Sequence, residues 1–464
     1  MSALWTRDEA VAATGGSCPV DWQASGLSID TRTLEKGDIF VALSAVRDGH
    51  DFVAQALEKG AAAALVSRIP EGLEGAPLLL VPDVLKALEA LGIAARARCK
   101  AQVVAITGSV GKTGSKEMLR VALAGQGNIH VAEKSYNNHE GVPLTLARMP
   151  QDTDIAVIEI GMNHPGEIAP LARMARPHLA LITTVAPVHL AAFNSVEDIA
   201  AEKAEIFKGL EPGGVAILNG DLDTLPILQK AAGRAEVVCF GAGAHNDFRL
   251  RSFDIANGAT IVRADTPEGD ILFKLGGEGA HLAQNAIGVL AVLHALDADL
   301  ARATLELASW HPPEGRGARL EIALGPEGMD GSFTLINESY NANPASTRAA
   351  LETLVRQPGR KVAILGDMLE LGETGPALHN DLAPLAEGID VVHTVGPLMA
   401  VVPFETRSIT AFDSAELAHR IGRQVRAGDV VMVKGSLGMK MALVIDALKK
   451  LGDAGAAEKS EGVE

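Results

Sequence analysis

The stretch Val103-Val104-Ala105-Ile106-Thr107-Gly108-Ser109-Val110-Gly111-Lys112-Thr113 decides the fold expected around it. It reads as an apolar strand, a glycine loop and the start of the helical segment SKEMLRVALAG (115–125). Such a loop points backbone N–H groups at phosphate oxygens, places the lysine ammonium on the outer phosphates and puts the threonine hydroxyl on a magnesium ion. The stretch therefore predicts a nucleotide-phosphate site.

The common form of this motif, G-x-x-x-x-G-K-[ST], is not met here. Ile106 stands five positions before Gly111, and the first glycine has moved to Gly108. A Gly-Lys-Thr triplet alone also occurs in ordinary turns. The strand before it and the helix after it favour the phosphate loop over a turn.

Strand-like and helix-like segments alternate on both sides of this loop, which is typical of βαβ units. The strand candidates are DIFVAL (38–43), APLLLVP (76–82), DIAVIEIG (154–161), LALITTV (179–185), GVAILNG (214–220), FTLINESY (333–340), KVAILGDM (361–368), VVHTVG (391–396) and DVVMVKGS (429–436). The helix candidates include FVAQALEKGAAAAL (52–65) and HLAQNAIGVLAVLHAL (281–296). The pattern predicts an α/β protein with parallel sheets.

The 464 residues are enough for several domains, and we expect three. A small N-terminal α/β domain would span 1–98, and a central P-loop-type ATPase domain with a mostly parallel sheet would span 99–312. A Rossmann-like α/β domain would span 313–464, after the turn-rich segment HPPEGRGAR (311–319), where residues 312–318 form a hinge candidate. The polar end of the chain, from about residue 452, is expected to be disordered.

Composition excludes several classes of protein. Lys and Arg total 41 against 58 for Asp and Glu, a formal charge of -17, which argues against a nucleic-acid surface. No apolar run approaches the ~20 residues of a membrane span, and the N-terminus lacks the features of a secretory signal. The three cysteines are far apart and suggest neither a disulfide framework nor a zinc knuckle. We expect a cytoplasmic monomer that holds anionic ligands in a local site.

Three further residues could serve a nucleotide site. Glu159 ends an apolar strand, where a carboxylate is costly to bury without a cation, although a strand-end Glu can also reach solvent. His189 follows a strand and Lys203 lies in a helical stretch. Taken singly, each of these two is more often structural than catalytic.

Together these residues resemble a known family, the Mur ligases, which are ATP-dependent amide-forming enzymes of peptidoglycan assembly. The segment Thr107–Thr113 is similar to that family's phosphate loop and accounts for the displaced glycine. The resemblance spans nearly the whole chain and is carried by SIDTRTLEKGDIFVAL, DGHDFV, SYNNHEGVPLTL, EIGMNHPGEI, SYNANPAS and LGDMLELG. The Asp-Asn-Pro-Arg signature of the members that add a diacid or lysine is absent, and Asn341-Ala342-Asn343-Pro344 resembles the type that adds D-alanyl-D-alanine.

The resemblance implies a ligase that joins D-alanyl-D-alanine to UDP-N-acetylmuramoyl-tripeptide through an acyl phosphate, with ATP and Mg²⁺. The alternatives that stay open are another Mur-type ligase, a folylpolyglutamate-type ligase with a different acceptor, and a nucleotide-gated ATPase that forms no amide. The base that deprotonates the attacking amine also stays open.

The resemblance further implies a role for individual residues. Those implied for ATP are Thr107, Gly108, Ser109, Val110, Gly111, Lys112, Thr113, Asn285, Arg316 and Glu338. Those implied for the two other substrates are Ser28, Thr31, Arg32, Asn137, Asn138, Tyr340, Asn341 and Asn343. Those implied for magnesium are Thr113, Glu159, His189 and a carbamylated Lys203, and those implied for catalysis are Lys112, His189 and Lys203.

Two departures from the family pattern bear on the site. Glu338 stands where relatives commonly carry an aspartate that contacts ribose, so that contact is expected to shift by one methylene. Ala191 and Ala192 stand where relatives often carry a glutamate, so an acidic contact near His189 is expected to be missing.

Overall fold

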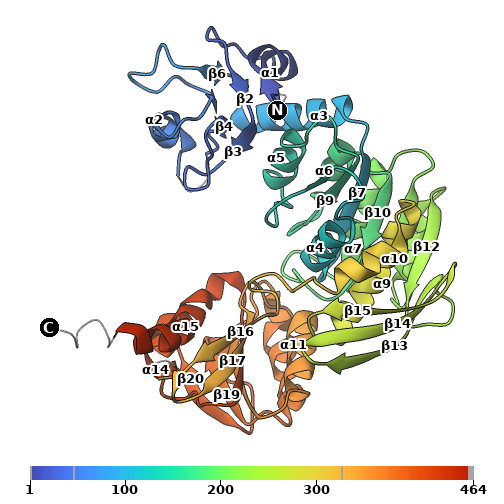
Figure 1. Ribbon diagram of the computed structural model, residues 1–464, viewed down its shortest axis with the longest axis vertical. Coiled ribbons are helices and arrows are strands. Elements are labelled where there is room, and N and C mark those ends of the chain that lie inside the picture. Colours follow the sequence, from blue (N-terminus) through green and yellow to red (C-terminus); the bar gives the residue numbers. More distant parts are fainter. Residues whose placement is uncertain (1–2, 45–46, 326–327, 458–464) are drawn as a thin grey trace.

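The computed structural model describes residues 3–44, 47–325 and 328–457. The chain forms three α/β units, each built on its own parallel-rich sheet, and a separate two-stranded ribbon. In Figure 1 the N-terminal and C-terminal units lie at opposite ends of the central one. The expected α/β class with a three-domain fold is confirmed.

The N-terminal unit has a four-stranded parallel sheet in the order β3-β4-β5-β6. Its strands and helices are β1 (Trp5–Thr6), α1 (Arg7–Thr14), β2 (Gln23–Ala24), β3 (Gly26–Ser28), β4 (Asp38–Val41), α2 (Val53–Glu58), β5 (Ala63–Val66), β6 (Leu78–Leu80) and α3 (Val84–Arg98). The core of this unit also includes Leu144 and Ala147 of the neighbouring helix α5 (Gly141–Ala147), so its packing continues into the central unit.

The central unit has nine strands in the order β15-β14-β13-β12-β11-β10-β7-β9-β8. They are β7 (Gln102–Thr107), β8 (Ile129–Val131), β9 (Ile155–Glu159), β10 (Leu179–Ile182), β11 (Val215–Asn219), β12 (Glu236–Gly241), β13 (Phe248–Ala256), β14 (Ala259–Thr266) and β15 (Gly269–Gly276). The strands from β8 to β13 pair in parallel, while β13, β14 and β15 form an antiparallel meander. This meander was not among the strand candidates, because its alternating, half-exposed residues lack a long apolar run.

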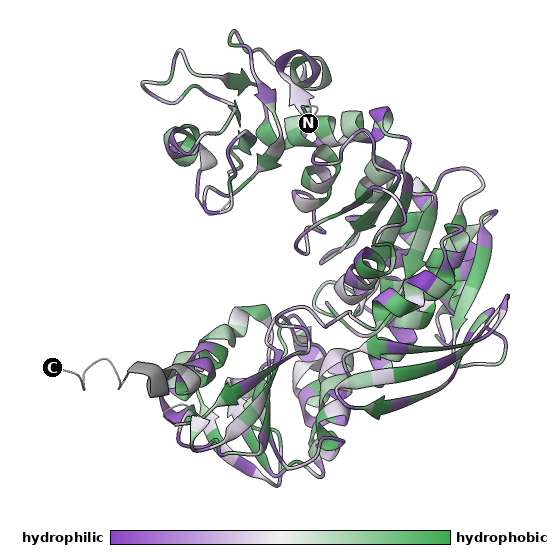
Figure 2. Ribbon diagram, viewed as in Figure 1, coloured by the Kyte–Doolittle hydropathy of each residue, from purple (hydrophilic) through white to green (hydrophobic). Residues whose placement is uncertain are grey.

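Helices cover both faces of the central sheet. They are α4 (Lys112–Ala122), α5, α6 (Ile168–Ala175), α7 (Val196–Ala204), α8 (Leu225–Ala232), α9 (Ala280–Ala295) and α10 (Leu300–Leu307). Alternate residues of β7 enter opposite cores: Val104 and Ile106 pack in one cluster, and Val103 and Ala105 pack in the other. A strand buried on both faces reads as a continuous apolar run, and Figure 2 shows the central strands as largely hydrophobic.

The C-terminal unit has six strands in the order β16-β17-β21-β18-β19-β20, of which only the β16-β17 pair is antiparallel. Its elements are β16 (Ala318–Ala323), β17 (Ser332–Glu338), α11 (Pro344–Val355), β18 (Arg360–Gly366), α12 (Gly375–Asn380), β19 (Val391–Val395), α13 (Pro397–Ala400), β20 (Arg407–Ala411), α14 (Ser414–Ile421), β21 (Asp429–Lys434) and α15 (Ala442–Ala457). The expectation of disorder from about residue 452 is wrong as far as Ala457, because α15 continues to that residue. Residues 458–464 lie outside the described part.

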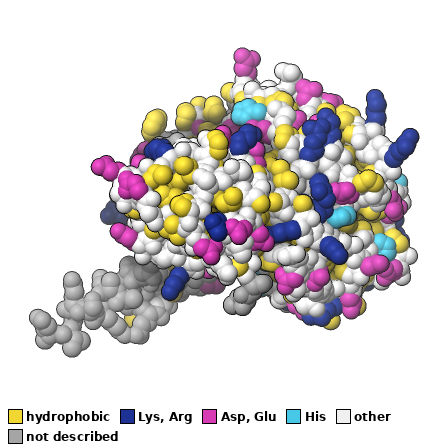
Figure 3. Space-filling view, turned by 90° about the horizontal axis from the view of Figure 1, so that it is seen from above, with side chains coloured by type: hydrophobic (Ala, Val, Ile, Leu, Met, Phe, Trp, Pro, Cys, Tyr) yellow, Lys and Arg dark blue, Asp and Glu magenta, His cyan; other side chains and the backbone are white. Residues whose placement is uncertain are grey.

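The molecular surface carries both signs of charge. Figure 3 shows acidic and basic side chains interspersed over one face. Among the helices of residues 3–44, 47–325 and 328–457, none combines the length and the apolar character that crossing a bilayer requires.

Parallel pairing brings three strand ends to one edge of the central sheet. Ile106 pairs with Glu159 of β9, and Thr107 pairs with Ile182 of β10. The loop after β7, the carboxylate at the end of β9 and the segment after β10 therefore meet at the carboxyl edge, where α/β sheets bind ligands.

Candidate active site

The loop between β7 and α4 has positive φ angles at two of its glycines. Gly108 has φ +153° and Gly111 has φ +89°, and a Cβ on Gly108 would lie only 1.9 Å from Thr183 Oγ1. A Cβ on Gly111 would lie 2.7 Å from Asn285 Oδ1. Helix α4 then begins at Lys112, so its free N–H groups face the loop, as at an anion site.

Lys112 lies against this loop. Its Nζ donates to the Gly108 carbonyl at 2.5 Å. The pKa of Lys112 is lowered to about 8, mainly by burial; the charge of Glu159 opposes this effect and the positive charge of Arg316 adds to it. Two cations that share one cavity indicate that the cavity suits a polyanion.

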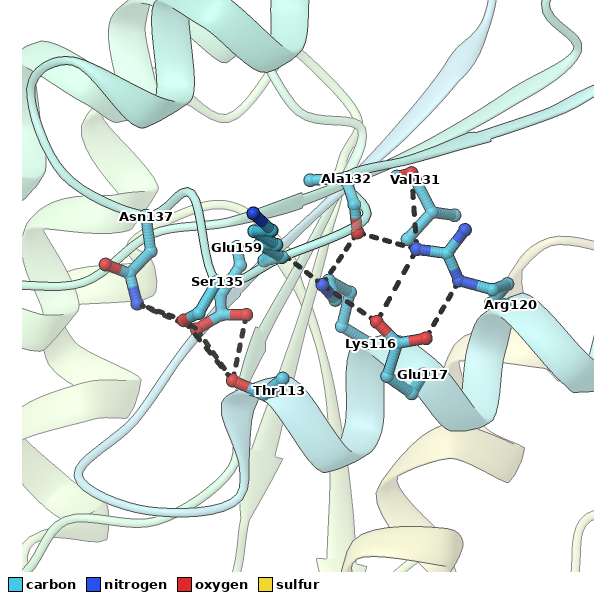
Figure 4. A network of polar contacts seen from close by, with 10 residues as sticks. Thr113, Lys116, Glu117, Arg120, Val131, Ala132, Ser135, Asn137 and Glu159 are labelled. Atoms are coloured by element: carbon cyan, nitrogen blue, oxygen red, sulfur yellow. Dashed lines mark hydrogen bonds and ion pairs between the residues drawn. The ribbon is translucent and has the colours of Figure 1, made fainter. Parts of the chain in front are cut away.

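Glu159 is 1% exposed and is surrounded by neutral donors, as Figure 4 shows. Its Oε1 accepts from Ser135 Oγ at 2.7 Å and from Asn137 Nδ2 at 2.8 Å. Thr113 Oγ1 lies 3.1 Å from both carboxylate oxygens. A buried carboxylate beside a hydroxyl fits a divalent cation that keeps waters and binds phosphate. Within the described ranges no three His, Cys, Asp or Glu side chains form a closed metal cluster.

Lys203, on α7, is 2% exposed. Over the described part of the chain, no hydrogen bond or ion pair joins its Nζ to another group. Burial, with a contribution from the charge of Lys112, holds the pKa of Lys203 well below its ordinary value. Burial thus disfavours the charged form of this side chain.

His189 joins the central unit to the C-terminal one. Its Nδ1 lies 2.7 Å from Glu370 Oε2, and the Ala191 N–H donates to the Glu370 carbonyl at 3.2 Å. Burial lowers the pKa of His189, and the hydrogen bond to Glu370 partly offsets this effect. An acidic side chain thus does lie beside His189, although it comes from the C-terminal unit and not from the two alanines after Leu190.

The C-terminal side of the cavity is formed by the loop after β17 and the end of β21. Lys434 is 2% exposed, and its Nζ donates to Glu338 Oε2 at 3.2 Å and to the Asn341 carbonyl at 3.0 Å. The Arg316 guanidinium lies 4.0 Å from the centre of the Tyr340 ring, a cation–π contact that orients it.

Most of these groups, although not Thr113 and Lys203, line one cavity of about 560 Å³. The expected residues that line it are Ser109, Val110, Gly111, Lys112, Asn137, Glu159, His189, Asn285, Arg316, Glu338, Tyr340, Asn341 and Asn343. Asn343 also caps helix α11 by accepting from the Ser346 N–H, so part of its role is structural. The cavity is thus built from the central and C-terminal units together.

Other expected residues lie outside the lining. Thr107, Gly108, Thr113 and Lys203 are not among the lining residues, and Asn138 accepts from the Gly141 N–H at the start of α5. Ser28, Thr31 and Arg32 lie in the N-terminal unit. There the Arg32 guanidinium pairs with Asp30 and lowers the pKa of that carboxyl to about 2.

Sequence reasoning missed several residues of this site: Ser135, Glu370, Lys434 and Ser436. All four lie in quoted segments, namely SYNNHEGVPLTL, LGDMLELG and DVVMVKGS. Polar residues at or just beyond the end of a parallel strand were the available signal for Lys434 and Ser436, because strand ends of one sheet meet at one edge.

Comparison with known proteins shows the family to which the chain belongs. Residues 106–293 match the family model described as the Mur ligase middle domain, and residues 319–437 match the model described as the Mur ligase, glutamate ligase domain. The chain belongs to the Mur ligase family, whose members are ATP-dependent ligases that form amide bonds.

Individual relatives within the family are similar to this chain over most of their length. A protein of Escherichia coli (strain K12), named UDP-N-acetylmuramoyl-tripeptide--D-alanyl-D-alanine ligase, is 36% identical over 439 residues, covering 93% of this chain and 95% of the relative. The crystal structure of MurF from Acinetobacter baumannii matches with a TM-score of 0.83 and 29% identity over 96% of this chain and 99% of that one. The MurF ligase from Thermotoga maritima in complex with ADP has a TM-score of 0.76 and 27% identity, over 92% of this chain and 98% of that one.

Proposed function

We propose that this protein joins D-alanyl-D-alanine to UDP-N-acetylmuramoyl-tripeptide at the expense of ATP, giving the pentapeptide precursor of peptidoglycan, ADP and phosphate. One observation carries the proposal: a single cavity contains a phosphate loop, a buried carboxylate and the SYNANPAS loop, in a chain similar along its length to ligases of that name. The enzyme would act in the cytoplasm as a monomer.

The three units would divide the work. Residues 1–98 would bind the UDP end of the substrate through Ser28, Thr31 and Arg32. Residues 99–312 would hold ATP, and 313–464 would close over it with Arg316 and Glu338. The Arg32 side chain is 86% exposed, and its ion-pair partner is the nearby Asp30, two residues away in the chain. An exposed guanidinium with only this local partner supports a role in binding an anion.

The first chemical step needs charge neutralisation. A carboxylate oxygen of the tripeptide would form a bond to the γ-phosphorus while the bond from that phosphorus to ADP breaks, which gives an acyl phosphate. Lys112 and Arg316 would stabilise the negative charge that both reactants bring. Asn285, packed on Gly111, would hold the loop against the nucleotide.

Thr113, Glu159 and His189 would hold Mg²⁺, and the buried carboxylate with its hydroxyl neighbour fits that ion. When bound, the ion supplies electrophilic stabilisation of phosphate oxygens. In the protein, Ser135 and Asn137 fix the orientation of the Glu159 carboxylate, and Glu370 fixes the ring of His189.

Lys203 would be carbamylated. The neutral amine would form an N–C bond to carbon dioxide and release one proton, which converts a neutral side chain into an anionic carbamate. Its lowered pKa and the lack of a hydrogen-bonding partner in the described structure both support this reading, because only an unprotonated amine can react.

In the second step the amine of D-alanyl-D-alanine would form a C–N bond to the acyl carbon while the C–O bond to phosphate breaks. The amine loses a proton to a base that we do not assign. Exclusion of water by the closed cavity would protect the acyl phosphate from hydrolysis.

A product assay tests the proposal. Purified protein with ATP, Mg²⁺ and UDP-tripeptide should release phosphate and yield a pentapeptide, identified by mass spectrometry, with D-alanyl-D-alanine. Turnover only with glutamate or lysine would show a different Mur-type or folylpolyglutamate-type ligase. If the rate of ATP hydrolysis did not change when UDP-muramoyl substrates were added, the protein would instead be a nucleotide-gated ATPase.

A further inference from the structure

A fully buried lysine with no part in the steps above lies one turn after the phosphate loop. Lys116, on α4, has no exposed surface. Its Nζ donates to the Ala132 carbonyl at 2.8 Å and to the Lys134 carbonyl at 3.0 Å, and it pairs with Glu117 Oε1 at 2.8 Å. Burying an ammonium is costly unless such partners compensate it.

The two carbonyls belong to the segment 131–137, which begins with the last residue of β8, leads towards α5 and carries Ser135 and Asn137. Three residues of α4 contact this segment in order, as Figure 4 shows. Arg120 donates to the Val131 and Ala132 carbonyls, Lys116 donates to those of Ala132 and Lys134, and Thr113 Oγ1 lies 3.4 Å from Ser135 Oγ. Positions three, four and seven apart share one face of a helix, so one face of α4 sets the register of the whole segment.

That register decides what surrounds Glu159. Ser135 directly follows the second carbonyl bound by Lys116, and its hydroxyl donates to Glu159 Oε1 at 2.7 Å. Asn137 Nδ2 donates to the same oxygen and also to Ser135 Oγ at 2.9 Å. A displacement of residues 132–134 would therefore move both donors away from the carboxylate.

We propose that Lys116 is a positioning residue that sets the magnesium affinity of the nucleotide site, by fixing the 131–137 segment so that Ser135 and Asn137 orient Glu159. The inference rests on the proposed function, because it takes Glu159 as a magnesium ligand. Outer partners of metal ligands commonly change affinity by about 10–100-fold when removed.

The test substitution is Lys116→Met, which keeps the length of the side chain and removes the ammonium. Both carbonyls keep a second donor in this variant, since Arg120 donates to Ala132 O and the Tyr136 N–H donates to Lys134 O at 2.9 Å. The matched control is Arg120→Met, on the same helix face and with the same carboxylate partner, Glu117, but without a contact to Lys134.

The readout is the rise in melting temperature that ADP causes as Mg²⁺ is titrated, which needs no turnover. We expect the Mg²⁺ concentration at half-maximal rise to increase about tenfold in Lys116→Met and less than about threefold in Arg120→Met. ADP without Mg²⁺ should bind both variants and the wild type alike. A lower melting temperature with an unchanged Mg²⁺ midpoint would mean that Lys116 only stabilises the fold and would overturn the inference.

A double-mutant cycle with Ser135→Ala separates positioning from an independent effect. If Lys116 acts through Ser135 and Asn137, the loss of Mg²⁺ affinity in the double variant should be smaller than the product of the two single fold-changes. Fold-changes that multiply would overturn the inference. Should Lys116→Met fail to fold, Lys116→Arg replaces it in the same cycle, with an expected shift of about threefold. A wild-type protein without any Mg²⁺ response would instead refute the proposed magnesium site itself.

Discussion

The Nδ1 atom of His189 and the Oε2 atom of Glu370 lie 2.7 Å apart and connect the central unit to the C-terminal unit. Both residues have a left-handed backbone, with φ of 53° and 65°. Few residues other than glycine adopt this conformation without cost, so two such residues facing each other indicate loops that are shaped for this contact.

Removing the Glu370 carboxylate should change the pKa of His189 but leave the free energy of unfolding nearly unchanged. Because the contact with Glu370 raises the pKa of His189 against the effect of burial, Glu370→Ala should lower that pKa further. Glu370 is 62% exposed, so the free energy of unfolding should change by less than about 1 kcal/mol. NMR titration of the His189 ring and chemical denaturation measure the two effects, and a raised pKa would contradict the first.

Lys112→Met should reduce acyl-phosphate formation by about a thousandfold, because the substitution removes a preorganised cation from the transferring phosphoryl group. Phosphate release in single turnovers measures the loss. Lys112→Arg, which keeps the charge, is the control and should retain more activity. Turnover near the wild-type rate in Lys112→Met would refute the role of this lysine.

The lowered pKa of Lys112 predicts that nucleotide affinity depends on pH. With a pKa of about 8 in the free protein, Lys112 loses its proton as the pH rises through that value, and affinity for ATP should fall above it. An anion next to the lysine raises its pKa, so binding at pH 8 should take up protons. Calorimetry in buffers of different ionisation enthalpy detects this uptake, which should disappear in Lys112→Met.

Lys203→Met should separate stability from activity. A lysine whose pKa is lowered in the folded state binds fewer protons there than in the unfolded chain, so it opposes folding from low pH up to the ordinary lysine pKa. Below that pH, replacing it by an apolar side chain of similar length should leave the melting temperature unchanged or higher. Turnover should fall by about 100-fold, as when a partner of a metal site is removed.

Lys203→Ala tests the carbamate. Short carboxylates such as acetate should partly restore its turnover by occupying the place of the carbamate group. The intact wild-type protein should also gain the mass of one carbon dioxide in bicarbonate buffer. Absence of both effects would exclude carbamylation and leave the family assignment untouched.

Tyr340→Leu should weaken nucleotide binding through Arg316. The guanidinium lies over the ring at 4.0 Å, and losing such a contact costs about 0.5–2 kcal/mol, or about 2- to 30-fold in affinity. Tyr340→Phe keeps the ring and is the matched control. Equal ADP affinities of the leucine and phenylalanine variants would show that the stacking does not position Arg316.

The predictable parts of this protein were those with a local signal. The central parallel strands can be predicted because they are apolar runs. The loop 107–113 can be predicted from its glycines and lysine, which stand between a strand and a helix. Strands β13 to β15 and the edge strands β16 and β20 have no such runs, because one face or one edge of each meets solvent. The part of α15 between residues 452 and 457 also escaped prediction, since its composition resembles that of a tail.

The sequence by itself determined the α/β class, the phosphate loop and the family, since each depends on residues that lie close together in the chain. Only the tertiary structure decided that Lys116, Lys203 and Lys434 are all buried, and that two of them are compensated by carbonyls and carboxylates while Lys203 is not. It also decided that Glu370 meets His189 across 181 positions. The physical reason is that burial and charge pairing depend on which distant segments pack together, and parallel sheets place neighbours side by side that the chain order keeps far apart.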